Sequence, residues 1–244
     1  MKSPNFNDRK LPISMLVLHY TGMESAEAAR DRLCDASAEV SAHYLVLEDG
    51  SVEQLVNEDK RAWHAGVGSW NGITDVNSAS IGIEIVNGGH NFPLADGSLP
   101  PFPDMQILAV IKLCKEIIER HDIPQSNIVG HSDIAPARKE DPGEHFPWSG
   151  LAAAGVGLWP SDLTDDDRVL FEPNDRDRGV AILQRGLAEI GYRLSVTGQL
   201  DDETQSVIRA LQRRYRPTRI GGIIDMQVVD IIKRLNEMRQ ASIS

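Results

Sequence analysis

Five short apolar runs occur within the first 130 residues of the chain, and each predicts a β-strand. They cover residues 13–20, 42–47, 52–56, 80–86 and 127–130. The second and third runs are separated by a segment with an Asp-Gly pair, which is typical of a β-hairpin. In the fourth run isoleucine alternates with other residues, so one face of that strand is expected to be buried.

Helix signals lie between these runs. Ser25 is a suitable N-cap for a helix over residues 26–33. Asp104 is predicted to cap a longer amphipathic helix. Its expected buried stripe consists of Ile107, Leu108, Ile111, Cys114, Ile117 and Ile118. Because strands and helices alternate, we expect an α/β domain in which helices flank a mixed sheet.

An internal repeat marks the C-terminal part of the chain. Residues 198–211 align without gaps with residues 222–235. Each copy contains a glycine turn, an apolar residue, an aspartate cap and a helical pattern. Another amphipathic helix is predicted just before the repeat, at residues 180–190. Three short helices predict a small helical domain.

The balance of basic and acidic residues also changes near residue 178, just before this C-terminal part. Residues 178–244 contain 11 basic and 7 acidic side chains, whereas the preceding part contains 14 and 29. We therefore expect a larger domain at 1–160, an acidic linker at 161–177 and a three-helix domain at 178–244. The acidic main part argues against nucleic acid as a partner.

Two further features bear on location and redox state. No run of about 18 apolar residues is present, so no transmembrane segment is expected. The N-terminal residues lack the apolar segment of a signal peptide, which predicts a cytoplasmic protein unless a leader has been removed from an envelope protein. Cys34 and Cys114 lie in helical patterns and are expected to be reduced. The oligomeric state cannot be inferred from these patterns.

Candidate metal ligands follow two of the predicted strands. His19 and His131 each end an apolar run, and Asp141 follows in a Pro-Gly turn segment. Two imidazoles and one carboxylate can hold Zn²⁺ and leave a fourth position open for chemistry. Any one histidine is more commonly a structural residue, so the spacing allows both a structural and a metal-binding interpretation.

Two charged residues could complete such a site. Glu84 lies on the strand face opposite the alternating isoleucines, where a carboxylate could accept a proton from an attacking water. Lys139, two residues before Asp141, could stabilise an oxyanion. The alternatives are a surface glutamate on a strand and a solvated lysine in a charged loop.

Five blocks of sequence occur in one order and carry a family resemblance. They are Leu18-His19-Tyr20-Thr21, Ser41-Ala42-His43-Tyr44, Trp63-His64-Ala65-Gly66, Ile81-Gly82-Ile83-Glu84 and the segment Gly130 to Gly143, which Phe146-Pro147-Trp148 follows. Together they resemble the signature of the type-2 N-acetylmuramoyl-L-alanine amidases. The pairs Leu183-Gln184, Gly191-Tyr192, Thr197-Gly198 and Leu211-Gln212 resemble a three-helix peptidoglycan-binding domain.

The amidase resemblance implies a complete set of catalytic residues. It implies zinc on His19, His131 and Asp141, with Glu84 as catalytic base and Lys139 as the group that stabilises the transition state. The implied reaction is hydrolysis of the amide between N-acetylmuramic acid, or its anhydro form, and L-alanine of peptidoglycan stem peptides.

The resemblance also implies a substrate cleft and leaves alternatives open. Tyr44, His64 and Asn87 fall in or beside blocks that line the family's cleft. The expected partners are peptidoglycan or soluble (anhydro)muropeptides. A peptidoglycan-recognition module that does not cut its ligand is the main alternative, and a zinc peptidase acting within the stem peptide is another. The C-terminal domain could bind cell wall or pack as a lid.

Overall fold

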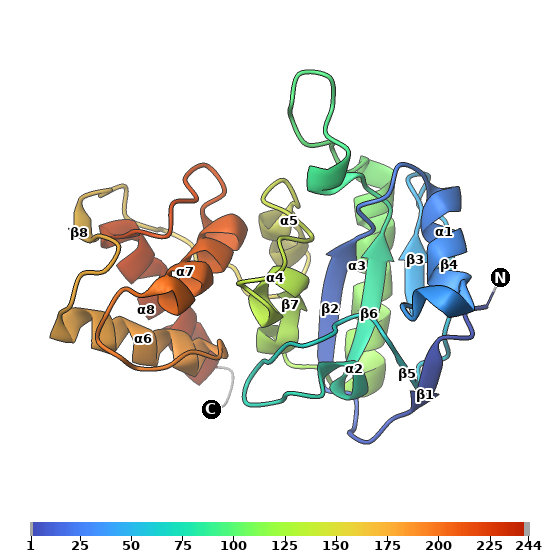
Figure 1. Ribbon diagram of the computed structural model, residues 1–244, viewed down its shortest axis with the longest axis horizontal. Helices are drawn as coiled ribbons and strands as arrows, with labels where there is room; N and C mark the ends of the chain where they lie inside the picture. Colours follow the sequence, from blue (N-terminus) through green and yellow to red (C-terminus); the bar gives the residue numbers. More distant parts are fainter. Residues whose placement is uncertain (1, 242–244) are drawn as a thin grey trace.

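In the computed structural model, which describes residues 2–241, the strands of the main sheet gather in one part of the molecule and the C-terminal helices in another (Figure 1). The strands are β1 (Phe6–Asp8), β2 (Met15–Tyr20), β3 (Tyr44–Val46), β4 (Val52–Gln54), β5 (Lys60–Ala62), β6 (Ser80–Ile85), β7 (Ile128–Gly130), β8 (Val169–Phe171) and β9 (Ile224–Asp225). The α-helices are α1 (Ala26–Cys34), α2 (Val76–Ala79), α3 (Asp104–His121), α4 (His131–Ile134), α5 (Trp148–Ala153), α6 (Arg178–Ile190), α7 (Asp202–Tyr215) and α8 (Met226–Ala241). Short 3-10 helices are η1 (Ala36–Ala38), η2 (Gly89–Asn91) and η3 (Gln125–Asn127).

The main sheet has five strands in the order β4-β3-β6-β2-β7. Strand β2 pairs in parallel with both β6 and β7, and β3 pairs in parallel with β6. Only β4 runs antiparallel, as the second strand of the predicted hairpin with β3. The expected mixed sheet is therefore confirmed, and helices pack on it as expected.

Alternation along the strands gives the sheet two different faces. Leu16 and Leu18 of β2 lie in one apolar cluster with the β6 isoleucines and with α3. Met15 and Val17 lie in another cluster on the opposite face. Because side chains alternate with a period of two, His19 belongs to the face that is turned away from α3.

The buried stripe of α3 differs from the prediction. Leu108 is 65% exposed, whereas Val110 and Leu113 are buried together with Cys114 and Ile117. The buried face also contains Gln106, which is fully buried and donates hydrogen bonds to the carbonyl oxygens of Val46 and Val86. A polar residue anchors this face, which an apolar pattern does not reveal.

The repeat at residues 198–211 and 222–235 forms two similar turns that lead into α7 and α8. Gly198 and Gly222 both have positive φ angles, of 69° and 73°. Asp201 accepts a hydrogen bond from the backbone of Thr204, and Asp225 accepts one from Val228. With α6, these helices make the predicted three-helix domain, to which the β8–β9 pair adds a short ribbon.

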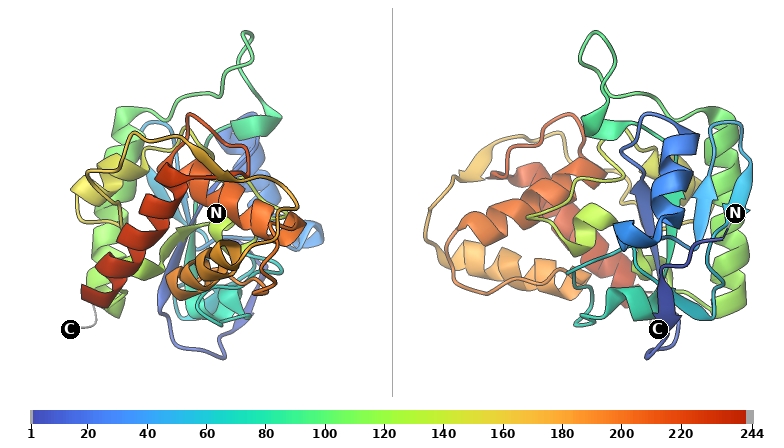
Figure 2. Two further views of the ribbon diagram at one scale, coloured as in Figure 1. Left: turned by 90° about the vertical axis from the view of Figure 1, so that its left-hand side faces the viewer. Right: turned by 45° about the vertical axis from the view of Figure 1, so that its right-hand side comes forward.

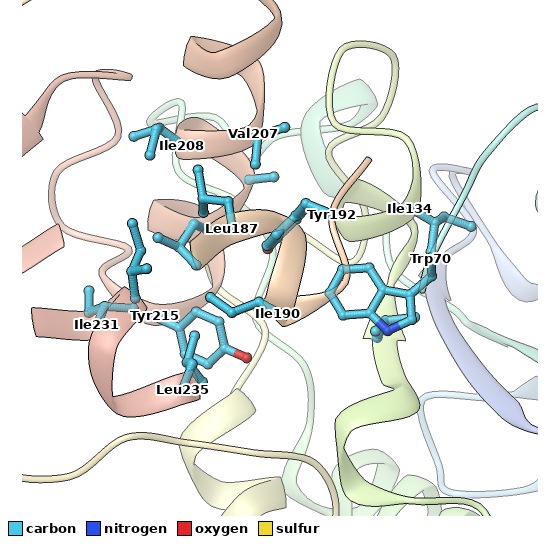
Figure 3. Packing of buried hydrophobic residues seen from close by; sticks show 14 of the residues in the cluster. Trp70, Ile134, Leu187, Ile190, Tyr192, Val207, Ile208, Tyr215, Ile231 and Leu235 are labelled. Atoms are coloured by element: carbon cyan, nitrogen blue, oxygen red, sulfur yellow. The ribbon is translucent and has the colours of Figure 1, made fainter. Parts of the chain in front are cut away.

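The two parts of the molecule share one apolar cluster. Figure 3 shows Leu187, Ile190 and Tyr192 of the helical part close to Trp70 and Ile134 of the sheet part. The rings of Trp70 and Tyr192 meet edge to face, with centroids 5.0 Å apart. Helix α7 packs against α4, and the right-hand view of Figure 2 shows the helical part directly beside the sheet part. Within residues 2–241, no helix is long and apolar enough to cross a membrane.

We expect Tyr192→Phe to lower the free energy of unfolding by about 1.5–3 kcal/mol. The Tyr192 hydroxyl donates a 2.7 Å hydrogen bond to the buried carboxylate of Asp133, and phenylalanine keeps the ring but removes this donor. Urea denaturation of the full chain measures the change. Tyr215→Phe is the matched control, because Tyr215 is a buried tyrosine of the same domain outside this contact. Equal stabilities of the wild type and Tyr192→Phe would contradict the prediction.

Candidate active site

The carboxyl ends of three neighbouring parallel strands bring the site together. His19 lies next to the end of β2, and in the sheet register it faces Glu84 near the end of β6. His131 follows β7 directly, as the first residue of α4. Ends of adjacent parallel strands meet at one edge of a sheet, which is where ligands bind in open α/β folds. The register therefore brings residues 112 positions apart into contact.

Three side chains converge at this edge. The Nδ1 atoms of His19 and His131 lie 3.0 Å apart, and Oδ2 of Asp141 lies 3.0 Å from each of them. All three residues are buried. Four ligands at about 2.0–2.1 Å around a tetrahedral ion lie roughly 3.3 Å from one another, so the observed spacing is close to that of a metal site.

Hydrogen bonds to the Nε2 atoms, which point away from the site, determine which nitrogen of each imidazole carries the proton. His131 Nε2 lies 3.0 Å from the carbonyl oxygen of Ala65, to which only a protonated nitrogen can donate. The neutral His131 ring therefore has a free lone pair on Nδ1. The Ala65 carbonyl oxygen therefore leaves Nδ1 as the nitrogen with which His131 could bind an ion.

A chain of buried hydrogen bonds behind His19 determines which of its ring nitrogens carries the proton. The Ser80 hydroxyl donates to the carbonyl oxygen of Val76 at 2.6 Å, so its oxygen is left to accept from Nε2 of His64. His64 Nδ1 then accepts from Nε2 of His19 at 3.1 Å. His19 is left with a free lone pair on Nδ1, which faces His131 and Asp141.

The charges agree with this assignment. Burial lowers the pKa of His19 to about 4 and the pKa of His64 well below its usual range, so both rings are neutral near pH 7. Burial alone would raise the pKa of Asp141, but its contacts with His131 and His19 hold that pKa well below the usual range. The site therefore presents the neutral imidazole of His19 and the carboxylate of Asp141, with Nδ1 of His131 beside them.

These donor atoms fit a divalent cation. With this assignment of protons, two lone pairs and a carboxylate oxygen face one another, and a bound positive charge would offset the cost of burying them. Among residues 2–241, His19, His131 and Asp141 are the one group of three or more His, Cys, Asp or Glu side chains whose ligand atoms all lie within 4.8 Å of one another.

A cavity of about 360 Å³ lies over the three ligand candidates and is also lined by Glu84 and Lys139. The Oε2 atom of Glu84 is enclosed and accepts no hydrogen bond from the residues that the structure describes. Burial raises the pKa of Glu84 well above its usual range, the charge of Asp141 raises it further, and Lys139 lowers it. Such a carboxyl group can exchange a proton with a reactant.

The three residues that we expected in the cleft occupy different positions. His64 lines the cavity and contacts His19. Tyr44 is buried away from it, with its hydroxyl donating to Glu58 at 2.6 Å. The Asn87 amide is also outside the cavity lining, where its Oδ1 accepts from the backbone of Gly89 and its Nδ2 donates to Pro100. In both cases a local hydrogen bond, rather than the cavity, fixes the side chain.

Several residues that support the site had not been singled out from the sequence. Asn77 Oδ1 accepts from the backbone of His64 and of Ala65, and so holds the carbonyl that orients His131. Arg138 lines the cavity and donates to the same Ala65 carbonyl at 2.9 Å. No spacing or repeat marks Asn77, because its partners lie 12 and 13 residues away in a loop.

Comparison with known proteins identifies the family. The model of the N-acetylmuramoyl-L-alanine amidase family matches residues 9–144. The N-acetylmuramoyl-L-alanine amidase AmiD of Escherichia coli K12 is 38% identical over 235 residues, which cover 92% of this chain and 83% of AmiD. The chain belongs to the N-acetylmuramoyl-L-alanine amidase family. It is a hydrolase that cleaves the amide between N-acetylmuramic acid and L-alanine.

Solved structures of two relatives match both parts of this amidase. The complex of Escherichia coli AmiD with anhydro-N-acetylmuramic acid-L-Ala-D-γ-Glu-L-Lys has a TM-score of 0.80 and 37% identity, and covers 93% of this chain and 89% of AmiD. AmpDh3 of Pseudomonas aeruginosa, in complex with anhydromuramic pentapeptide, has a TM-score of 0.76 and 32% identity, with 93% and 92% covered. A second family model, the putative peptidoglycan binding domain, matches residues 176–232. Both family resemblances are confirmed.

We expect Gly82→Ala to weaken the binding of a divalent metal by this amidase at least tenfold. A Cβ at Gly82 would lie 2.3 Å from Cγ of His64, so the ring must move and His19 would lose its partner. Competition with a chromogenic chelator measures the affinity. Gly150→Ala is the control, because a Cβ there meets nothing within 4 Å. An unchanged affinity in Gly82→Ala would show that His64 does not orient His19.

Proposed function

We propose that His19, His131 and Asp141 hold a catalytic zinc ion, with Glu84 as general base and Lys139 as the stabilising cation. The supporting observation is the set of three buried acceptor atoms, 3.0 Å apart, beside a cavity that Glu84 also lines. Two imidazoles, one carboxylate and an open position are typical of catalytic zinc. Calcium and magnesium prefer oxygen ligands, so the two nitrogen donors argue against them.

The residues around the cavity have complementary roles. When bound, zinc supplies a Lewis acid that polarises the substrate carbonyl and makes the attacking water more acidic. Glu84 accepts the proton of that water and returns it to the amine of the departing L-alanine. The raised pKa of Glu84 suits a group that must take up a proton and then release it. Lys139 lines the same cavity and stabilises the negative charge on the carbonyl oxygen.

The proposed substrates are muropeptides, including those with the anhydro sugar. The ligands in the complexes of AmiD and AmpDh3 support this choice, since both contain an anhydromuramic acid and a peptide. His64 stays in the proposal as a residue of the substrate cavity. Trp63 also lines the cavity and offers an aromatic surface to a sugar, whereas Trp70 is 3% exposed and packs against Tyr192.

We further propose that residues 1–160 form the catalytic unit and residues 178–244 the peptidoglycan-binding-like unit. The connecting segment 161–177 includes β8, which pairs with β9 of the C-terminal unit. The match of a peptidoglycan-binding family model to residues 176–232 supports this division.

Digestion of defined substrates tests the function. The full chain, loaded with zinc and assayed for metal content, is incubated with anhydro-N-acetylmuramyl tripeptide and, in a second arm, with intact sacculi. Mass spectrometry is expected to find a released peptide with a free L-alanine amine. Bound zinc beside intact substrate in both arms would favour a recognition module. Cleavage within the peptide would favour a peptidase.

We expect Glu84→Gln to lower kcat by about 10²–10⁴-fold, because an amide cannot take the proton from water. Zinc content should stay at the wild-type level, since Glu84 is not one of the proposed ligands. Glu116→Gln is the control, because Glu116 is an exposed glutamate of α3. Wild-type turnover in Glu84→Gln would refute its role as base.

We expect Lys139→Met to lower kcat by about 10²–10³-fold and to leave KM within a few-fold of the wild type. Methionine keeps the apolar part of the side chain but removes the charge that stabilises the transition state. Steady-state kinetics on the anhydro-N-acetylmuramyl tripeptide measure both constants, with Lys115→Met on the exposed side of α3 as control. A change in KM alone would instead assign Lys139 to ground-state binding.

A further inference from the structure

Two consecutive arginines near the end of α7 turn away from their own domain and into the catalytic one. The side chains of Arg213 and Arg214 are only 9% and 5% exposed. Both make their ion pairs with acidic residues of the amidase part, 73 and 81 positions earlier in the chain. In Figure 1, α7 lies beside α4, the helix that His131 begins.

Arg214 binds the segment that carries His131. Its Nη1 donates to Asp133 Oδ2 at 2.7 Å, and its Nη2 donates to the carbonyl oxygen of Ile128 at 3.0 Å. The guanidinium group also lies over the ring of Trp148, 3.9 Å from its centroid. Arg214 therefore contacts β7 and α4, the elements immediately before and after the turn into His131.

The carboxylate of Asp133 fixes the start of α4 from within. Its Oδ2 also accepts a 2.8 Å hydrogen bond from the backbone of Gly130, and its Oδ1 accepts from Tyr192. Two of these three donors, Arg214 and Tyr192, come from the C-terminal domain. A buried carboxylate is stable only when such donors satisfy it, so this turn depends on the neighbouring domain.

Arg213 binds the segment that carries Asp141. Its Nη2 donates to Glu140 Oε1 at 2.8 Å, and its Nε lies 3.4 Å from Glu144 Oε2. These two glutamates lie one residue before and three residues after Asp141. The Asp141 carbonyl in turn accepts a 2.9 Å hydrogen bond from the backbone of Ser132, next to His131. The two ligand segments are thus joined to each other and to α7.

We propose that Arg213 and Arg214 are positioning residues for the metal centre, so that the C-terminal domain is part of the catalytic apparatus. Burying two guanidinium groups costs free energy, which is offset here by their ion pairs with the catalytic domain. A domain that only bound cell wall and was attached through a linker would not need these two buried ion pairs. The proposal rests on the proposed function, because it takes His131 and Asp141 as ligands. It gives the domain a role separate from binding cell wall.

The zinc dissociation constant of the full chain tests the proposal, measured by competition with a chromogenic chelator. We expect Arg213→Ala to weaken zinc binding about tenfold, in the range found when residues that orient ligands are removed. Arg213→Lys should recover part of the affinity, since the charge remains. Arg214→Lys should also weaken binding, because an ammonium group cannot replace the two directed bonds and the stacked plane.

Arg216→Ala is the matched control. Arg216 is a buried arginine two residues further on, and it pairs with the buried Asp225 inside the C-terminal domain. Its loss should lower the stability against urea but leave the zinc dissociation constant within twofold of the wild type. A similar loss of zinc affinity in Arg216→Ala would mean that general destabilisation explains the effect, and would overturn the proposal.

Two other results separate this proposal from the function on which it rests. Wild-type zinc affinity in both Arg213→Ala and Arg214→Lys would overturn the positioning role and leave the zinc site intact. Arg213→Ala provides this test even where Arg214 variants do not fold, because Glu140 is half exposed and tolerates the loss of its partner. A wild-type chain that binds no zinc would overturn the ligand assignment and this proposal together.

Discussion

The central constraint in this protein is electrostatic: three buried acceptor atoms face one point. Nδ1 of His19, Nδ1 of His131 and Oδ2 of Asp141 lie 3.0 Å from one another in a buried site, an arrangement that a bound cation would stabilise. The carboxyl edge of the sheet supplies the rigidity for this. Adjacent parallel strands fix the backbone of two of the three residues before any side chain is considered.

Hydrogen bonds behind the two histidines determine which ring nitrogens face the site. The carbonyl oxygen of Ala65 determines which nitrogen of His131 carries the proton. A chain of hydrogen bonds through His64 and Ser80 does the same for His19. Both routes end on backbone carbonyl oxygens, which cannot lose or gain a proton at ordinary pH. Each ring therefore turns Nδ1 towards the site, and Glu84, whose Oε2 is enclosed and has no hydrogen-bond donor among the described residues, is the proposed proton acceptor beside it.

The helical domain is joined to the catalytic domain by two kinds of contact. One is apolar and centres on Trp70 and Tyr192, and it is large enough to form a single cluster with the domain's own core. The other is ionic and directed, through Arg213 and Arg214. Apolar packing holds two surfaces together with little preference for angle, whereas a pair of directed ion pairs fixes the orientation.

The sequence alone determined the elements and much of the chemistry. Short apolar runs predicted the strands of the main sheet, and alternation within residues 80–86 predicted the face on which Glu84 lies. The glycine and aspartate positions of the repeat predicted the turns into α7 and α8. The candidate ligands could be named because strand ends and a family signature mark them. These features are local, so a few neighbouring residues are enough to specify them.

Only the tertiary structure decided the features that depend on long-range contacts. They include the buried Gln106 on the inner face of α3, the positions of Tyr44 and Asn87 outside the cavity lining, and the support that Asn77 gives to the site. The tertiary structure also turned Arg213 and Arg214 towards partners more than 70 residues away. The physical reason is that burial and hydrogen-bond partners of a polar side chain are set by whichever segments fold against it, and a periodic pattern contains no information about those segments.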